Sequence, residues 1–495
     1  MKAVKGKYYF GGIHVKDMKD ISKNSALEVL PEPETAAISC SQSIGKPSAP
    51  CVEVGQAVKQ GQIIAKAEGV VSSNVFASIA GTVTEIKDLK GAGGADEKYI
   101  FIKRGEKAEK EFLKPLTSPS AEEIRERIKD AGIVGLGGAG FPTAVKLNPS
   151  TQIDTLIVNG AECEPYLTCD YRLMLEKTDE IVRGARYAAK ALGAEKIVIA
   201  IEANKPDCIA LFENYEDIQP VILAKKYPMG GEKQLIFVTT GRKVGLGKLP
   251  ADVGVVVQNV ATCFAVCEAV ELGKPLFERV VTVSGKGVKE PKNIWVKLGT
   301  PVKDIVDFCG GELDTPVNVD RLTPEEKEKY LKKQKREEQK LINKQKREEQ
   351  RLIKKQKREE KRLIKKQKRE EKRLAKEAKK ESKKPLTEAQ LLKKKKREEK
   401  RLIKEQKREE KRLIKEQKRK EKQLIKEQKL EEKRLEAIKV KKVVQGGPMT
   451  GTALATYNDY THKTTSGILL LRKSEAAAEE PTPCLNCGMC ADVCP

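Results

Sequence analysis

Between residues 322 and 442 the chain repeats a unit of eleven residues. This repeat restricts the segment almost entirely to helical structure. Each unit resembles Lys-Gln-Lys-Arg-Glu-Glu-Lys-Arg-Leu-Ile-Lys. Eleven residues in three turns give about 3.67 residues per turn, close to a straight α-helix. The period therefore predicts long, highly charged helices. One leucine marks each copy: Leu341, Leu352, Leu363 and Leu374, then Leu391, Leu402, Leu413, Leu424 and Leu435.

Local signals divide the repeat into two helices. Thr323-Pro324 has the form of an N-cap followed by proline at the first helical position. Pro385 interrupts the repeat, and Thr387 with Gln390 offers a new capping box. The two helices are of roughly equal length, about 90 and 80 Å at 1.5 Å per residue. We therefore expect an antiparallel helical hairpin, or coiled coil, although its thin apolar seam leaves two independent helices as an alternative.

The same segment carries the whole excess of positive charge. The chain holds 97 basic and 72 acidic residues, a net charge of +25, and residues 321–440 contribute 51 basic and 25 acidic residues to it. The remainder is nearly neutral. Alternating charges without aromatic residues favour a solvated arm that reaches a partner, over a specific nucleic-acid or membrane surface.

The rest of the chain has the character of a soluble, reduced protein. Its apolar runs are strand-sized and far shorter than the roughly 20 residues that a membrane helix needs. The N-terminus lacks the apolar core of a signal peptide. The twelve cysteines are accordingly expected to be thiols or metal ligands rather than disulfides.

An N-terminal segment, 1–29, precedes a strand-rich module at 30–105. Short alternating runs with glycine turns predict a small barrel or sandwich. The pattern resembles the lipoyl/biotinyl barrel-sandwich module, which carries its cofactor on a lysine at a hairpin tip. The tip here is Ser72-Ser73-Asn74 and holds no lysine. We therefore expect a packing or docking module.

Residues 115–275 alternate helix-like and buried strand-like segments, which predicts an α/β sheet covered by helices. Strand patterning returns at 276–321 and again at 443–472. These two pieces are expected to form one small β-grasp-like domain that the helical insertion at 322–442 interrupts. The chain is thus predicted to be a multidomain protein of mixed α+β and α/β class.

Four cysteines close the chain in the pattern C-x2-C-x2-C-x3-C-P, which is typical of bacterial ferredoxins. Zinc is a weaker alternative, because zinc sites pair separate C-x2-C knuckles. A second such run should follow in a two-cluster ferredoxin domain, so residues 480–495 are expected to be its first half and the sequence to be truncated. The candidate metal ligands are Cys484, Cys487, Cys490 and Cys494.

A glycine-rich segment, Gly135–Lys146, offers backbone N–H groups and a lysine to a phosphate group. It does not match the P-loop of ATP-binding proteins. The glycines alone leave a nucleotide or flavin phosphate site and a simple turn about equally supported. Asn159–Pro165 ends a buried strand, where α/β proteins bind ligands, and a solvated turn is its alternative.

These motifs together resemble known families. Gly135–Lys146, Asn159–Pro165, Tyr227–Lys233 and Gln258–Thr262 resemble the FMN and NADH contacts of the NADH-oxidising subunit of respiratory complex I. The fuller resemblance is to the C subunit of the Rnf complex, an ion-translocating ferredoxin:NAD oxidoreductase. It adds, in order, Gly11-Gly12-Ile13-His14, Ser41-Gln42, the barrel-sandwich module, Gly446-Gly447-Pro448-Met449 and the ferredoxin-like tail.

The resemblance implies a cofactor role for twelve residues and no catalytic side chain. Gly135, Gly137 and Lys146 would hold the FMN phosphate. Asn159, Glu162, Asn259 and Thr262 would bind the flavin body. Gly138, Phe141, Glu164 and Glu232 would line the nicotinamide side, and Gly230 would also contact cofactor. Ala161 and Gly231 stand where complex I has acidic residues, and Ser43 and Phe76 stand where Rnf proteins often have histidine.

The implied function is electron transfer between NAD(H) and [4Fe-4S] clusters through FMN, in a translocase complex. Two clusters, FMN and NAD(H) are the implied cofactors. Other Rnf subunits are the implied partners, and the implied location is peripheral, at the cytoplasmic face of the bacterial inner membrane. The alternative is a flavin-free iron–sulfur scaffold. The other cysteines are expected to be packing thiols: Cys40, Cys51, Cys163, Cys169, Cys208, Cys263, Cys267 and Cys309.

Overall fold

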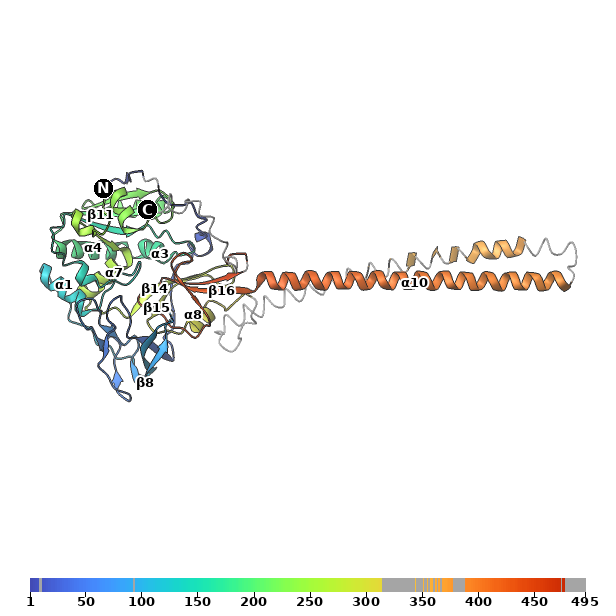
Figure 1. The fold of residues 1–495 in the computed structure, drawn as a ribbon, viewed down its shortest axis with the longest axis horizontal. Helices are drawn as coiled ribbons and strands as arrows, with labels where there is room; N and C mark the ends of the chain where they lie inside the picture. Colours follow the sequence, from blue (N-terminus) through green and yellow to red (C-terminus); the bar gives the residue numbers. More distant parts are fainter. Residues whose placement is uncertain are drawn as a thin grey trace. The chain divides into compact units, whose positions relative to one another are not determined.

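The computed structural model describes residues 1–8, 11–91, 94–313, 388–472 and 474–476, most of 361–376, and residues 343, 350, 354, 357 and 358. Contacts divide the chain into two compact units (Figure 1). One unit comprises residues 1–315 and 436–495, and the other comprises 316–435. The candidate iron–sulfur ligands Cys484, Cys487, Cys490 and Cys494 lie outside the described residues.

A five-stranded parallel sheet forms the centre of the first unit. Its order is β1-β12-β11-β10-β13. Apart from the exposed edge strand β1, the strands are rich in buried apolar residues, as expected where a parallel sheet is covered on both faces. The edge strand β1 comes from the N-terminal segment. The bounds are β1 Val4–Lys5, β10 Thr155–Gly160, β11 Lys196–Glu202, β12 Ile218–Leu223 and β13 Val255–Asn259.

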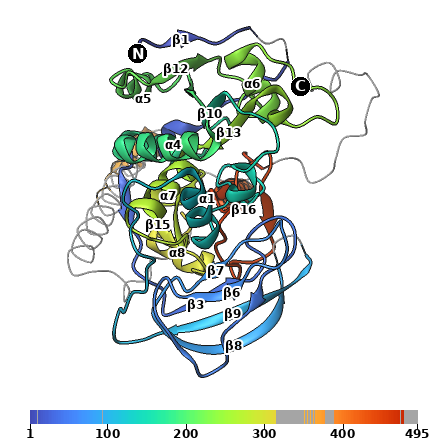
Figure 2. The same ribbon diagram turned by 90° about the vertical axis from the view of Figure 1, so that its left-hand side faces the viewer.

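Helices cover both faces of this sheet (Figure 2). Alternate residues of β10 point to opposite faces, so Leu156 packs with the helices of one layer and Ile157 with α6 on the other. A capping box at Ser120 and Glu123 begins α1. The helices are α1 Ala121–Asp130, α3 Cys169–Glu176, α4 Thr178–Leu192, α5 Pro206–Phe212, α6 Glu232–Thr240 and α7 Val260–Glu271.

A six-stranded sheet joins the segments on either side of the helical insertion. Its order is β17-β16-β18-β14-β15-β2, and β14 pairs in parallel with β18 through Thr282 and Gly467. The N-terminal segment supplies the edge strand β2, so the same segment enters two sheets. The elements are β2 Leu27–Val29, β14 Glu278–Ser284, β15 Lys292–Lys297, α8 Val302–Phe308, β16 Val440–Gln445, β17 Thr452–Leu454 and β18 Gly467–Arg472.

Strands β3 to β9, between residues 35 and 104, form two small sheets, and glycine-punctuated strands were expected in this part of the chain. One sheet has four strands, β3-β9-β8-β5, and the other has three, β4-β6-β7 (Figure 2). Alanine, valine and isoleucine side chains form most of the core of this module. The tip residues Ser72 and Ser73 are buried against the rest of the unit. The strands are β3 Thr35–Ser39, β4 Ala49–Pro50, β5 Ala57–Val58, β6 Ile63–Lys66, β7 Val75–Phe76, β8 Gly81–Lys90 and β9 Asp96–Arg104.

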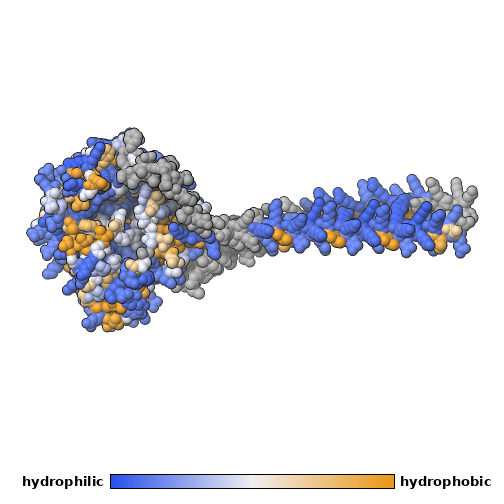
Figure 3. Space-filling view, in the orientation of Figure 1, coloured by the Kyte–Doolittle hydropathy of each residue, from blue (hydrophilic) through white to orange (hydrophobic). Residues whose placement is uncertain are grey.

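The second half of the repeat forms one continuous helix, α10, over Glu388–Ile438. Its leucine side chains between 391 and 424 are about half exposed, for example Leu402 at 60%, and Figure 3 shows apolar residues as a row along the helix. Helical residues also occur between 361 and 376. The antiparallel pairing of two helices stays a prediction, because most of the first half lies outside the described residues. In the part of the chain that the structure describes, no helix is long and apolar enough to cross a membrane.

Candidate functional site at the carboxyl ends of β10 and β13

The glycine-rich segment forms a closed loop between α1 and the short helix α2 (Thr143–Lys146). The backbone N–H of Gly135 donates to Phe141 O at 2.9 Å, so the loop closes on itself. Residues 137–139 at its tip are exposed, and nothing lies within 4 Å of a Cβ built on Gly138. The loop thus presents backbone to open space, which a bound phosphate group requires.

The loop rests on the N-terminus of α7. Leu136 N–H donates to the Thr262 hydroxyl at 2.9 Å. A Cβ on Gly137 would lie 2.7 Å from Asn259 Nδ2, so no larger residue fits there without a shift. Asn259 is the N-cap of α7 and accepts from Ala261 N–H at 2.8 Å. The predicted residues of the loop and of the strand end at β13 therefore meet.

Lys146 and Glu232 also meet, although 86 residues separate them in the chain. Lys146 Nζ lies 2.5 Å from Glu232 Oε1, and both side chains are about one-third exposed. Glu232 opens α6, so the pair joins the end of the loop to the other face of the sheet. Exposure keeps this ion pair weak, about 0–1 kcal/mol, and available for exchange with an anion.

Asn159 and Gly230 lie together at the end of β10. Asn159 Nδ2 donates to Gly230 O at 2.9 Å, and its Oδ1 accepts from Ala161 N–H at 3.1 Å. Gly230 N–H in turn lies 3.4 Å from Cys163 Sγ. Burial raises the pKa of the Cys163 thiol to about 11, so this cysteine is protonated at neutral pH. It packs against the site as a neutral thiol.

Glu162 turns into the protein. Its backbone has φ +46°, its side chain is 3% exposed, and Oε1 accepts from Asp170 N–H at 2.7 Å. Oε2 lies 3.3 Å from Nζ of Lys19, which belongs to the short helix η1 (Lys19–Ile21) of the N-terminal segment. The carboxylate that the resemblance assigns to the flavin body is therefore engaged in a buried ion pair in this structure.

Glu164 connects the site to the six-stranded sheet, at the turn between β16 and β17. Its carboxylate accepts from Met449 N–H at 3.0 Å and from the Thr450 hydroxyl at 2.7 Å. These partners belong to the turn that follows Gly446-Gly447, so two motifs about 285 residues apart in the chain are in contact. Glu164 thus fixes this turn beside the site.

Asp170 is a buried carboxylate of the site that sequence reasoning missed. Burial, reinforced by the nearby charge of Glu162, raises its pKa to about 6. Asp170 Oδ2 accepts from Asn259 Nδ2 at 2.7 Å, so both ends of the Asn259 amide are held. No sequence pattern marks Asp170, because its importance comes from packing beneath α7.

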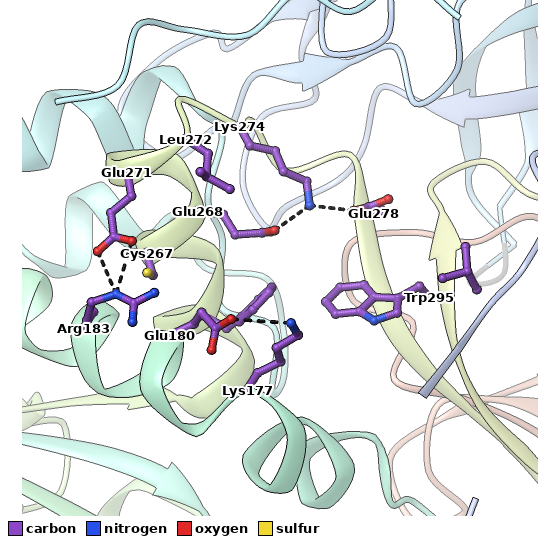
Figure 4. Close-up of a pocket in the computed structure, with 12 residues that line it drawn as sticks. Lys177, Glu180, Arg183, Cys267, Glu268, Glu271, Leu272, Lys274, Glu278 and Trp295 are labelled. Carbon is purple, nitrogen blue, oxygen red and sulfur yellow. Dashed lines mark hydrogen bonds and ion pairs between the residues drawn. The ribbon is translucent and has the colours of Figure 1, made fainter. Parts of the chain in front are cut away.

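A cavity of about 490 Å³ lies elsewhere, between α4, the second half of α7 and β15 (Figure 4). None of the twelve predicted cofactor residues lines it. Its charged groups pair among themselves: Lys177 with Glu180, Arg183 with Glu271, and Lys274 with Glu268 and Glu278. Its walls thus carry partnered charges around Trp295 and Phe264.

The candidate site contains no metal-ligand set in the described residues. No group of three or more His, Cys, Asp or Glu residues there is arranged to hold a metal ion. The eight other cysteines are free, and seven of them are buried or partly buried. Burial raises the pKa of Cys40 to about 11 and that of Cys263 and Cys309 to about 12, which suits packing thiols.

Comparison with protein families matches three parts of the chain. Residues 128–268 match the family described as the Nuo51 FMN-binding domain, which includes the glycine-rich loop and all twelve cofactor candidates. Residues 7–107 match the RnfC barrel sandwich hybrid domain. Residues 280–329 match the SLBB domain. The expected mixed α/β multidomain architecture is therefore confirmed.

Curated relatives match a little under two thirds of the chain. The C subunit of a proton-translocating ferredoxin:NAD(+) oxidoreductase complex from Clostridium ljungdahlii is 47% identical over 63% of this chain and 70% of its own length. The corresponding Na(+)-translocating protein from Acetobacterium woodii is 39% identical over 64% of this chain and 74% of its own. The C subunit of an ion-translocating oxidoreductase complex from Rhodobacter capsulatus is 42% identical over 63% of this chain, but only 62% of its own length is covered.

Proposed function

The chain belongs to the family of C subunits of ion-translocating ferredoxin:NAD(+) oxidoreductase complexes, and from this membership we propose that it exchanges electrons between NAD(H) and iron–sulfur clusters through bound FMN. One observation carries the proposal. The open glycine-rich loop rests on Asn259 and Thr262, at the carboxyl end of β13 and within the segment that matches an FMN-binding family. Ligands of open α/β sheets bind at this edge.

The phosphate of FMN fits the loop tip. The exposed backbone at Gly137 offers an N–H group, and Lys146 supplies a positive charge at the end of α2. Lys146 is paired with Glu232 in this structure, so phosphate binding exchanges one anionic partner for another. Gly135 closes the loop through its bond to Phe141 O and so keeps the tip in shape.

The rest of the flavin, beyond its phosphate, would contact polar groups at the carboxyl ends of β10 and β13. Asn259 is held at both ends by Asp170 and Ala261, so its position under the loop is defined before any ligand arrives. Asn159 and Gly230 form the adjacent edge. Glu162 supports this edge from below through Asp170 rather than through a free carboxylate. Bound FMN would supply the redox chemistry, which converts a hydride transfer into single-electron steps. The chain binds and orients the FMN.

The nicotinamide side is assigned to Gly138, Phe141, Glu164 and Glu232. Gly138 has open space beside it, which allows a planar ring to approach the backbone. Glu164 is held by the turn at Met449, so the turn between β16 and β17 forms one wall of this side.

The remaining assignments extend the same proposal. Cys484, Cys487, Cys490 and Cys494 bind iron–sulfur clusters, supported by their ferredoxin spacing. The chain assembles with other subunits of an Rnf complex and lies peripherally at the cytoplasmic face of the membrane. The helical insertion forms a hairpin arm that reaches a partner. Support for the arm comes from the eleven-residue period and the continuous helix α10.

Purified protein supplied with FMN tests the proposal directly. We expect a flavin absorbance spectrum that NADH bleaches. Lys146→Met should weaken FMN binding about tenfold through loss of one charge-assisted contact. Lys129→Met, at an exposed lysine of α1, is the matched control and should bind as wild type.

A correctly folded chain that binds no flavin at high FMN concentration contradicts the proposal and favours a flavin-free iron–sulfur scaffold. The insertion is tested separately by deletion of residues 325–440. NADH-dependent bleaching should survive this deletion while association with other subunits is lost. Loss of bleaching would show that the insertion is part of the flavin site.

A further inference from the structure

Lys463 is a buried lysine that no motif in the sequence marks. It lies in the segment between β17 and β18, and its side chain has no exposed surface. Nζ donates to Ser73 Oγ at 2.9 Å, Asn74 O at 2.7 Å and Gly132 O at 2.8 Å. Among the described residues, no carboxylate lies within ion-pairing distance of it. The groups that face the ammonium are thus one hydroxyl and two carbonyls.

Arg279 of β14 is a second buried cation. It is 3% exposed, and no carboxylate in the described part of the chain lies within ion-pairing distance of it, although the charge of buried Asp170 interacts with the guanidinium. Its guanidinium donates to Lys463 O, to Val280 O at 3.2 Å and to Leu136 O at 3.3 Å. The two buried cations are therefore connected, because the Arg279 guanidinium donates to the backbone carbonyl of Lys463.

Both cations bind backbone carbonyls at or just before the start of the glycine-rich segment. Lys463 holds the carbonyl of Gly132, which precedes the loop, and Arg279 holds the carbonyl of Leu136, inside it. A trans peptide directs its N–H opposite to its C=O. Arg279 therefore turns the N–H of Gly137 away from itself, toward the exposed tip where the ligand phosphate is proposed to bind.

The surrounding contacts leave this arrangement little freedom. Gly132 has φ +62°, and a Cβ there would lie 2.5 Å from Asn74 O. Lys463 N–H donates to Gln42 Oε1 at 2.8 Å, which holds the backbone of the lysine against the barrel sandwich. Burial lowers the pKa of Lys463 to about 7, so keeping this ammonium charged is costly. The ammonium is hydrogen-bonded but has no counter-charge within ion-pairing distance among the described residues, so its charge can act on the adjacent loop.

We propose that Lys463 and Arg279 are positioning residues that hold the glycine-rich loop from behind and direct positive potential toward the phosphate of its flavin ligand. This inference rests on the proposed function. It predicts that these buried cations, together with exposed Lys146, make the site prefer FMN over riboflavin, which has the same ring and ribityl chain but no phosphate.

Affinities for FMN and riboflavin at pH 6.5 test the inference, because a purely structural role would change both alike. We expect Lys463→Met to weaken FMN binding about tenfold, as for removal of one poorly screened charge, and to change riboflavin binding less than about threefold. Lys463→Gln should behave in the same way. Ser73→Ala removes one hydrogen bond of the ammonium but no charge, so it is the control and should keep the wild-type preference.

Equal losses for the two flavins, or an unchanged preference in Lys463→Met, would overturn the inference while leaving the proposed function intact. A wild-type protein that binds neither flavin would instead overturn the proposed function. The preference for FMN over riboflavin can also be measured on wild-type protein at different salt concentrations, and this test remains available if the variants do not fold. Buried charges are screened little, so the preference should persist in 0.5 M KCl, and its collapse would assign it to exposed Lys146 alone.

Discussion

The buried ion pair between Lys19 and Glu162 gives the most direct test of how the site is supported. Lys19 is 7% exposed and Glu162 is 3% exposed on their side chains, and the two charged atoms lie 3.3 Å apart. Lys19 Nζ also donates to Glu164 O at 3.1 Å and to Leu167 O. Lys19→Met would leave a buried carboxylate without this counter-charge and two carbonyls without their donor.

Removal of one member of a buried pair costs about 3–5 kcal/mol, because the remaining charge stays desolvated. We expect the lower part of this range, about 3 kcal/mol. Buried Lys205 lies close enough for its charge to interact with that of Glu162 and offset part of the loss. The change should also weaken FMN binding, since Glu162 and Glu164 shape the loop beside the strand end.

Urea denaturation, followed by tryptophan fluorescence, measures this loss. The chain has a single tryptophan. It is Trp295 on β15, directly paired with Val29 of the N-terminal segment, so the signal reports the region that Lys19 anchors. Lys19→Met/Glu162→Gln removes both charges and should recover at least half of the lost stability.

Lys23→Met is the matched control from the same segment. Lys23 is 42% exposed and pairs with Asp20, which is 82% exposed, so its loss should cost less than about 0.5 kcal/mol. A loss below about 1 kcal/mol in Lys19→Met, or a double variant no more stable than the single one, would refute the reasoning that an unpaired Glu162 is the source of the destabilisation.

Three further predictions concern stability. Gly184→Ala should destabilise the unit by several kcal/mol in the same urea assay, because the new Cβ would lie 1.7 Å from Cys263 O and force α4 and α7 apart; an unchanged midpoint would contradict this. Ser120→Ala should cost about 1 kcal/mol by removal of the capping box with Glu123, and Ser120→Asp, which keeps a cap, should cost less. Between pH 7 and pH 9 the wild type should gain about 2 kcal/mol of unfolding free energy relative to Lys463→Met, since the folded lysine releases its proton near pH 7 while the unfolded one keeps it to about 10.5. Parallel pH profiles of the two proteins would refute this last expectation.

The local sequence pattern was enough to predict many of the helices, strands and loops. The eleven-residue period predicts helix wherever it occurs, because backbone geometry alone sets 3.6 residues per turn, and α10 follows it. Apolar runs such as Leu156–Val158 predict buried strands for a similar reason. The glycine-rich loop is predicted because glycines leave backbone N–H groups accessible, and Gly138 is indeed open. Which segments pair with one another is a different matter.

The N-terminal segment illustrates the limit. Nothing in it predicts that Val4 would pair in one sheet and Leu27 in another, yet β1 joins β12 and β2 joins β15. Partner strands of this kind are separated by more than 200 residues. Two-residue and three-residue strands carry almost no periodic signal, so only the completed sheets decide where they lie.

Within the site, too, the local sequence predicts some features and the tertiary structure decides others. The sequence by itself identifies the loop, the strand ends and the carboxylates near them, since these motifs are contiguous. Only the tertiary structure decides that Glu162 turns inward to Lys19, that Glu164 reaches Met449, and that Lys463 holds Gly132 across 331 residues. A side chain's role depends on its burial and its partner, and for charged groups the desolvation of the interior makes that partner decisive. Sequence motifs identify polar and charged side chains that lie close together in the chain. Packing determines which of these side chains are engaged by partners and which can bind a ligand.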